Sequence, residues 1–282
     1  MKCLIFGGNG FLGSRLLNKL SPKYEIFSSS RDSVFFSNFG DGESVNKVIQ
    51  EIKPKLIINC SALADVNGCE SEPNKAFKIN ALGVKEISES INALDKSIRF
   101  IHISTDHFYD SSEMSPEDKV LPKNIYAYSK LLGEKYIVND NALILRTNFF
   151  GKSLTSKRSF SDWLFESLSA GKSIDLYDDI FFNPLSIATI ESLIFRLISS
   201  SNKGVFNLGS SSFLSKHDFG LKFCIEAGLD ASNIRKVSSV VNNDYDKRPT
   251  SMIMSNKKFQ AKFDIMLPSL EEEITKSVKE YI

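Results

Sequence analysis

The chain has 282 residues, 42% of them apolar, which is enough for one large core or for one core with a smaller lobe. Its 35 basic and 34 acidic residues leave a formal charge of +1, so no field of one sign attracts nucleic acid or an anionic membrane. Composition therefore favours a small-molecule ligand over those two partners.

The cysteines and the apolar runs indicate the cellular compartment of the protein. Cys3, Cys60, Cys69 and Cys224 lack CxxC spacing, so we expect reduced core thiols and neither a metal site nor a disulfide framework. No apolar run approaches the ~20 residues of a membrane span, and the run at residues 2–6 is too short for a signal sequence. A cytoplasmic protein is expected.

The first half of the chain alternates short apolar runs with stretches of helical periodicity. The apolar runs predict buried strands at residues 2–6, 24–27, 56–60, 100–103 and 142–145. The periodic stretches predict helices at residues 11–20, 43–52, 74–93 and 125–138. Strands that alternate with helices predict an α/β fold with a doubly wound parallel sheet.

After Arg146 the pattern loosens. Helices are predicted at residues 159–170, 187–199, 215–227 and 270–281, and a strand at residues 205–208. Loops rich in Phe, Asn and Ser separate them, and no linker marks a boundary. We expect residues 151–282 to form mainly a smaller α/β lobe that binds substrate, interleaved with the first domain if its strands return to the main sheet.

The first predicted strand runs into a glycine-rich loop that opens a helix. Such a loop needs glycine for a tight turn, for close approach of the backbone to a pyrophosphate, and for close packing of helix and strand. Gly7, Gly10 and Gly13 stand at these positions, and the helix N-terminus favours phosphate charge. We therefore expect a Rossmann-type domain over residues 1–150. The loop residues assigned to a dinucleotide are Gly7, Asn9, Gly10, Phe11, Leu12 and Gly13.

The residues after the second predicted strand bear on the identity of the dinucleotide. NAD enzymes place an acidic residue there, about 20 residues after the loop, against the ribose hydroxyls. This chain has Ser28-Ser29-Ser30-Arg31. A guanidinium suits a 2′-phosphate, so Arg31 favours NADP(H) over NAD(H). Two alternatives stay open: a solvated loop arginine, and use of Asp32 if the strand is longer.

Tyr126 and Lys130 lie four residues apart in a predicted helix, so their side chains share one face with Cβ atoms about 6 Å apart. A nearby ammonium favours the phenolate and lowers the pKa of a phenol from about 10, which suits proton transfer. Thr105 ends the preceding strand, at the edge where parallel sheets place ligand-facing residues, although its hydroxyl could instead cap its own backbone. Together they predict the proton side of a hydride transfer, and hence an oxidoreductase.

With these residues placed, the chain resembles the extended short-chain dehydrogenase/reductase family. The motifs that carry the resemblance are Gly7 to Gly13, Asn59-Cys60-Ser61-Ala62, Asn80, Ser104-Thr105-Asp106, Tyr126 to Lys130 and Leu145-Arg146-Thr147. Other phrases resemble the branch that contains dTDP-4-dehydrorhamnose reductase, namely residues 58–70, Pro73 with Ala76, residues 182–185 and 204–208, and Arg248-Pro249 upstream of Met252. The resemblance runs from the first strand almost to the C-terminus.

The resemblance implies hydride delivery from NADPH to the C4 keto group of a nucleotide-diphosphate sugar, a 6-deoxyhexose. It implies that Tyr126 protonates the alkoxide, Lys130 orients the nicotinamide ribose and tunes Tyr126, and Thr105 polarises the carbonyl. Further cofactor contacts are implied for Cys60, Ser61, Ala62, Asn80, Ser104 and Thr147, with Asn80 supporting the adjoining strands. Substrate contacts are implied for Asp65, Val66, Asp106, His107, Asn148, Phe149 and Arg248. Arg248 would pair with the pyrophosphate or else form a surface salt bridge, and core packing is the alternative for Phe149.

His107 departs from the family pattern. The reductases usually continue Ser-Thr-Asp with Tyr-Val-Phe, where this chain has His107-Phe108-Tyr109. His107 is a candidate substrate ligand or second acid, with a polar surface histidine as the alternative. Related dehydratases need Asp-Glu after the threonine, and His107 stands in place of that Glu, which argues against dehydration. The acidic residues that link a dimer through magnesium in the family have no matching positions here, so neither a metal nor a dimer is assigned from the sequence, and a homodimer stays open.

Two other functions fit the same motifs. A nucleotide-sugar epimerase uses the same tyrosine and lysine but keeps its cofactor and returns the hydride. A non-catalytic regulatory or ligand-sensing member would tolerate loss of Tyr126 or Lys130, and both are present. The sequence does not name the sugar or its nucleotide.

Overall fold

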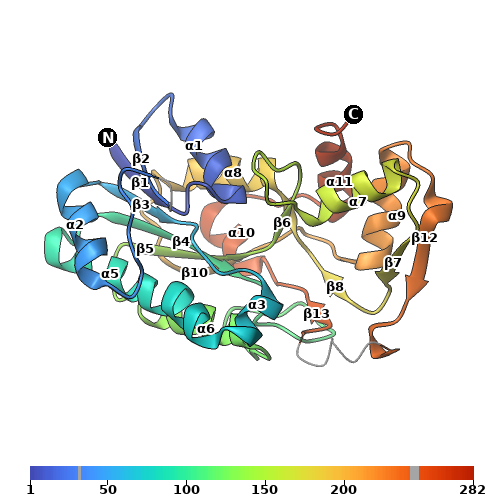
Figure 1. Ribbon diagram of the computed structural model, residues 1–282, viewed down its shortest axis with the longest axis horizontal. Helices are drawn as coiled ribbons and strands as arrows, with labels where there is room; N and C mark the ends of the chain where they lie inside the picture. Colours follow the sequence, from blue (N-terminus) through green and yellow to red (C-terminus); the bar gives the residue numbers. More distant parts are fainter. Residues whose placement is uncertain (31–32, 242–247) are drawn as a thin grey trace. The chain divides into compact units, whose positions relative to one another are not determined.

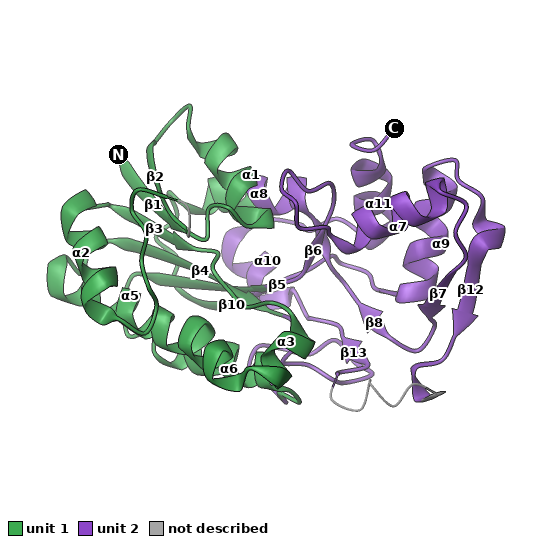
Figure 2. Ribbon diagram, in the orientation of Figure 1, with its two compact units in different colours: residues 1–105, 122–146, 193–206 green, residues 106–121, 147–192, 207–282 purple. Residues whose placement is uncertain are grey.

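The computed structural model describes residues 1–30, 33–241 and 248–282, which form two compact units (Figure 2). Unit 1 comprises residues 1–105, 122–146 and 193–206. Unit 2 comprises residues 106–121, 147–192 and 207–282. Each unit therefore draws on three separate stretches of chain. The division by binding role into residues 1–150 and 151–282 stays a prediction.

A six-stranded parallel sheet has the strand order β10-β5-β4-β3-β1-β2 and forms the centre of unit 1, with only the last residues of β5 and β10 assigned to unit 2 (Figure 1). Its strands are β1 (Lys2–Phe6), β2 (Glu25–Ser29), β3 (Leu56–Asn59), β4 (Arg99–Thr105), β5 (Ala142–Thr147) and β10 (Gly204–Leu208). β1 pairs with β2 on one side and with β3 on the other, so the strand order reverses direction at β1. This confirms the predicted α/β fold, and sheets of this type bind ligands at the carboxyl ends of the strands where the order reverses, here β1 and β3.

Helices cover both faces of this sheet. Figure 1 shows α1 on one face, and α2, α5 and α6 on the other. Their bounds are α1 (Phe11–Leu20), α2 (Gly42–Ile52), α5 (Gly83–Leu94) and α6 (Ile125–Lys135). Alternate strand side chains meet the helices, as where Leu4 and Phe6 of β1 pack with Ile49 of α2 and Ile87 of α5. The apolar residues whose spacing predicted these strands and helices are the residues that form this core.

The helix predicted over residues 74–93 is present, but it contains a π-helical turn that the apolar periodicity did not predict. The structure has α4 (Pro73–Phe77), a π-helical turn η1 (Lys78–Leu82) and then α5, with α3 (Val66–Ser71) just before them. Turns of this kind interrupt helices mostly at functional sites. Asn80 lies in the turn and forms hydrogen bonds with Leu63 and Ser129, outside the helix. The spacing of apolar residues does not report such bonds.

The described residues of unit 2 form three small sheets, β11-β8-β13, β7-β12 and β6-β9. Their strands are β6 (Phe149–Phe150), β7 (Ile174–Tyr177), β8 (Phe181–Phe182), β9 (Leu185–Ser186), β11 (Leu214–Ser215), β12 (Ile234–Val237) and β13 (Ser251–Met252). The helices are α7 (Phe160–Ser169), α9 (Lys216–Glu226), α10 (Lys257–Phe263), α11 (Leu270–Val278) and the 3₁₀ turns η2 (Ala231–Asn233) and η3 (Ser239–Val241). The remaining helix, α8 (Ile187–Leu197), begins in unit 2 and ends in unit 1.

Aromatic side chains fill the core of unit 2. Phe219 and Phe223 of α9 lie in one buried cluster with Phe150 and Phe182, and the rings of Phe150 and Phe219 meet edge to face at 4.8 Å.

In the described part of the chain, none of the helices has the length and apolarity that a bilayer crossing requires.

Candidate active site

The glycine loop of unit 1 is shaped by contacts that exclude side chains. Gly7 has φ of +82°, and a Cβ atom on it would lie 2.7 Å from the backbone nitrogen of Ser61. A Cβ on Gly13 would collide with the carbonyl oxygen of Gly7 and lie 2.8 Å from Cα of Gly8. Gly10 begins α1 without a side-chain cap, and the first turn of α1 carries no acidic residue. The backbone N–H groups there suit an anion, so the cradle fits a dinucleotide pyrophosphate.

Replacing Gly13 by alanine is expected to weaken dinucleotide binding at least tenfold, or about 1.4 kcal/mol. The added methyl group forces α1 away from the loop that forms the cradle. Titration calorimetry measures the affinity. Gly42→Ala is the control, because a Cβ there has its nearest neighbour at 3.6 Å. An affinity of the Gly13 variant within about threefold of wild type would contradict the assigned role of this contact.

Asn59, the last residue of β3, holds the next segment of the cradle in place. Its Oδ1 accepts hydrogen bonds from the Ser61 backbone nitrogen at 3.0 Å and from the Ser61 hydroxyl. Its Nδ2 lies 3.2 Å from Nδ1 of His102 on β4 and donates to it, because the amide oxygen is already taken. Burial lowers the pKa of His102 well below its usual value, and the charge of Lys130 lowers it further, so the ring is neutral. Ser61 is thereby fixed against Gly7.

Asn80 ties the same segment to α6. Its Oδ1 accepts from the Leu63 nitrogen at 2.8 Å, and its Nδ2 donates to the Leu63 carbonyl at 3.1 Å and to the Ser129 hydroxyl at 3.0 Å. Ser129 precedes Lys130 on α6. The sequence-based expectation that Asn80 supports adjoining strands is wrong: it links a loop to a helix.

Lys130 is almost fully buried, with 2% of its surface exposed, and its ammonium donates a 2.7 Å hydrogen bond to the carbonyl of Ile103 on β4. Burial lowers the pKa of Lys130 to about 8, against the opposing charge of Glu134. Tyr126 lies one helical turn before it on the same face of α6 and is 8% exposed.

The other residues predicted at this site also lie on elements of unit 1, apart from Thr147. Thr105 ends β4, two residues after the carbonyl that holds Lys130. Ser104 has a buried hydroxyl that makes no hydrogen bond to any described residue, so a ligand could supply its partner. Burial raises the pKa of Cys60 to about 12, so it stays a thiol. Thr147 is buried at the end of β5 and belongs to unit 2.

Three predicted residues receive less support from the structure. Arg31 lies outside the described residues. Asp65 is exposed and caps α3 by accepting a 3.2 Å hydrogen bond from the backbone of Asn67. Val66 is buried in a small cluster that includes Tyr126. Both thus have local structural roles, and their predicted contacts with substrate stay predictions.

Four of the predicted substrate residues form one polar cluster in unit 2. The carboxylate of Asp106 accepts a 2.7 Å hydrogen bond from Nδ2 of Asn148. Burial lowers the pKa of His107; Asp106 opposes this change, while Lys216 and Arg248 add to it. The ring is therefore uncharged at pH 7, and the residue is half-buried rather than a surface histidine. Lys216, which sequence reasoning missed, completes the cluster.

Phe149, the last predicted substrate residue, lies at the edge of this unit's core. It starts β6 and pairs with Leu185 of β9. The ring is only partly buried, whereas that of Phe150 is 1% exposed.

A buried ion pair joins Glu134 of α6 to Arg146 of β5. Nε of Arg146 lies 3.0 Å from Oε1 of Glu134, and Nη2 lies 2.7 Å from Oε2. Both side chains are at most 5% exposed. Glu134 stands one turn after Lys130, and its charge raises the pKa of that lysine.

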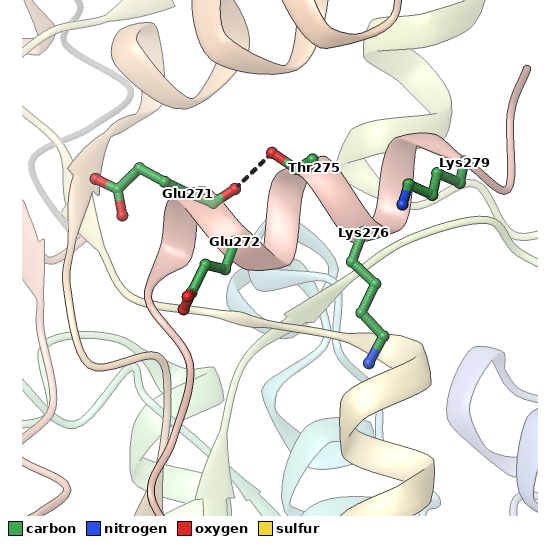
Figure 3. Close-up of a pocket in the computed structure, with 5 residues that line it drawn as sticks. All are labelled: Glu271, Glu272, Thr275, Lys276 and Lys279. Carbon is green, nitrogen blue, oxygen red and sulfur yellow. Dashed lines mark hydrogen bonds between the residues drawn. The ribbon is translucent and has the colours of Figure 1, made fainter.

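A surface hollow of about 360 Å³ runs along α11 and contains none of the predicted residues. Figure 3 shows its charged side chains spread along one helix. Several are already engaged: Lys276 donates to the Thr189 hydroxyl at 3.0 Å, and Glu272 completes the helix N-terminal cap with Ser269. We assign no ligand to it.

The parallel sheet, the glycine loop at its switch point and the Tyr–Lys helix define an extended short-chain dehydrogenase/reductase. Solved structures share this fold. A dTDP-4-dehydrorhamnose reductase from Bacillus anthracis, in complex with NADP, superimposes with a TM-score of 0.91 at 25% identity, over 99% of each chain. A hypothetical dTDP-4-dehydrorhamnose reductase from Sulfolobus tokodaii has a TM-score of 0.84 at 28% identity, over 96% of this chain and 98% of that one.

Within that class, the chain belongs to the RmlD substrate binding domain family, which matches residues 1–282. Two curated relatives are similar over nearly their whole length. A probable low-salt glycan biosynthesis reductase of Haloferax volcanii is 29% identical, covering 97% of this chain and 96% of the relative. The dTDP-4-dehydrorhamnose reductase of Escherichia coli K12 is 26% identical, covering 99% and 98%.

Proposed function

We propose that this protein is an NADPH-dependent reductase of a nucleotide-linked 4-keto-6-deoxy sugar. The observation that carries the proposal is the buried Lys130 ammonium, fixed to the strand that ends in Thr105 and one turn from Tyr126. This places a cation, a phenol and a hydroxyl on adjacent elements of the unit that contains the glycine cradle. Family membership, and relatives that are named as reductases of a nucleotide sugar, support the substrate class.

Each group has a role in this reduction. The nicotinamide, when bound, supplies the hydride that the carbonyl carbon accepts. Tyr126 gives its phenolic proton to the carbonyl oxygen as negative charge develops there, and Thr105 donates a hydrogen bond to the same oxygen. The charge of Lys130 favours the phenolate that remains, and its N–H groups are suited to the hydroxyls of the nicotinamide ribose.

NADP(H) is proposed over NAD(H) because Ser28-Ser29-Ser30 offers no carboxylate to the ribose hydroxyls at the end of β2. The Bacillus anthracis neighbour that binds NADP is consistent with this choice. Arg31 is the residue proposed to contact the 2′-phosphate.

The test offers the purified protein NADPH or NADH with dTDP-, UDP- and GDP-linked 4-keto-6-deoxy sugars. We expect one mole of NADPH to be oxidised for each mole of sugar reduced, with slower turnover of NADH. An epimerase would instead interconvert sugars without net loss of reduced nicotinamide. Absence of turnover with every sugar would contradict the proposal and favour a ligand-sensing role.

A further inference from the structure

Lys216 has an unusual environment in unit 2. It is the first residue of α9, where the positive end of the helix dipole disfavours a cation. Its Nζ lies 3.3 Å from the centroid of the Phe182 ring and 4.6 Å from that of Phe160. These rings stabilise the charge and fix its position.

The ammonium of Lys216 also lacks polar partners. Within residues 1–30, 33–241 and 248–282 it donates no hydrogen bond and forms no ion pair, and it lies over two aromatic rings. Aromatic faces offset part of the cost of desolvation but accept none of its N–H groups as an oxygen atom does. Lys216 is only partly buried, so an acceptor on a bound ligand can reach its ammonium in place of water.

The charges around Lys216 indicate what that acceptor is. Asp106 and Arg248 both act electrostatically on it, and the same three groups act on His107. His107 is neutral and Asp106 is engaged by Asn148, so two cations face one carboxylate. Counted over the described residues, the cluster has two cations and one carboxylate and is complementary to an anion, most of all to a diphosphate, whose several oxygens can accept from both cations.

We propose that Lys216 is a specificity residue that, together with Arg248, binds the diphosphate of the nucleotide-linked substrate. This inference rests on the proposed function for the identity of its ligand. It assigns phosphate recognition to a side chain that no motif marks, at the start of α9.

The test compares Lys216→Met with wild type as intact chains saturated with NADP⁺, so that the cofactor site is occupied. Calorimetry measures binding of dTDP, UDP and GDP and of the corresponding nucleosides. For the diphosphate that wild type binds most tightly, the variant is expected to lose at least tenfold in affinity, the loss of about one charge-assisted hydrogen bond. Affinity for the nucleoside should stay within about twofold.

Three controls separate recognition from structure. Lys216→Arg keeps the charge and should retain most of the affinity. Lys222→Met removes a lysine of the same helix that pairs with Glu226 at 2.6 Å, and should leave binding unchanged. The unfolding temperature of Lys216→Met should equal or exceed that of wild type, because methionine packs against aromatic rings without a charge to desolvate.

Three results would overturn the inference: equal diphosphate affinity in Lys216→Met and wild type, an equal loss for diphosphate and nucleoside, or no diphosphate binding by wild type. The reductase function is judged separately. Turnover of a nucleotide sugar with the same KM in both proteins would contradict the role of Lys216 alone. Diphosphate binding that depends on Lys216, without any turnover, would contradict the reductase function alone.

Discussion

Replacing Tyr126 by phenylalanine is expected to lower the turnover of the proposed reaction, NADPH with a 4-keto sugar, by about 100-fold or more, the usual contribution of a positioned acid. The substitution removes one hydroxyl and keeps the ring, which is packed with Val66, Cys69 and Ala76. Neither the fold nor NADP⁺ affinity should therefore change. Steady-state kinetics and calorimetry on the same preparation measure the two quantities.

The controls for this variant lie on the same helix. Tyr128 is 51% exposed, so Tyr128→Phe loses a hydroxyl two residues away, and its turnover should match that of wild type. Loss of both turnover and NADP⁺ affinity in Tyr126→Phe would point to a structural defect. Turnover equal to that of wild type would remove Tyr126 from the mechanism.

Replacing Arg146 by methionine is expected to lower the free energy of unfolding by about 3–5 kcal/mol. The substitution leaves the buried carboxylate of Glu134, whose side chain is 3% exposed, without the guanidinium that pairs with both of its oxygens. A buried charge without its partner destabilises the folded state. Urea unfolding followed by circular dichroism measures the change. Removal of both partners, in Arg146→Met with Glu134→Met, should restore only part of the loss: no carboxylate is left without its guanidinium, but the buried Lys130 then loses the stabilising charge of Glu134.

An exposed ion pair provides the matched comparison. Lys55 and Asp95 lie 2.8 Å apart, with 61% and 34% of their side chains exposed. Lys55→Met should cost no more than about 1 kcal/mol, because solvent screens such pairs. If Arg146→Met were as mild as Lys55→Met, the buried pair would not contribute as its geometry indicates.

Much of unit 1 could be predicted from sequence because local pattern and tertiary role coincide there. The run from Lys2 to Phe6 is apolar because it is a central strand, and the glycines that follow it are required by contacts within a few residues or with the next strand end. Tyr126 and Lys130 share a face by helical spacing alone. In each case the signal lies within one short stretch of chain.

What could not be predicted depends on contacts between distant stretches. The π-helical turn at Asn80 follows from bonds to Leu63 and Ser129, and no periodicity reports them. In the sequence Lys216 follows a capping serine, as many surface lysines do. Only the folded chain shows that its ammonium lies over the rings of Phe160 and Phe182. The two-residue strands of unit 2 are too short for alternation to show.

The joint at Asn80 also limits how this chain could change over evolutionary time. The carboxamide of Asn80 forms hydrogen bonds with both the backbone of Leu63 and the hydroxyl of Ser129. The helix bearing the phenol and the loop along the cofactor cradle are therefore coupled, and neither can slide along the other without breaking several bonds at once. New chemistry on this scaffold is more accessible by exchanging side chains in place than by moving the helix that presents them.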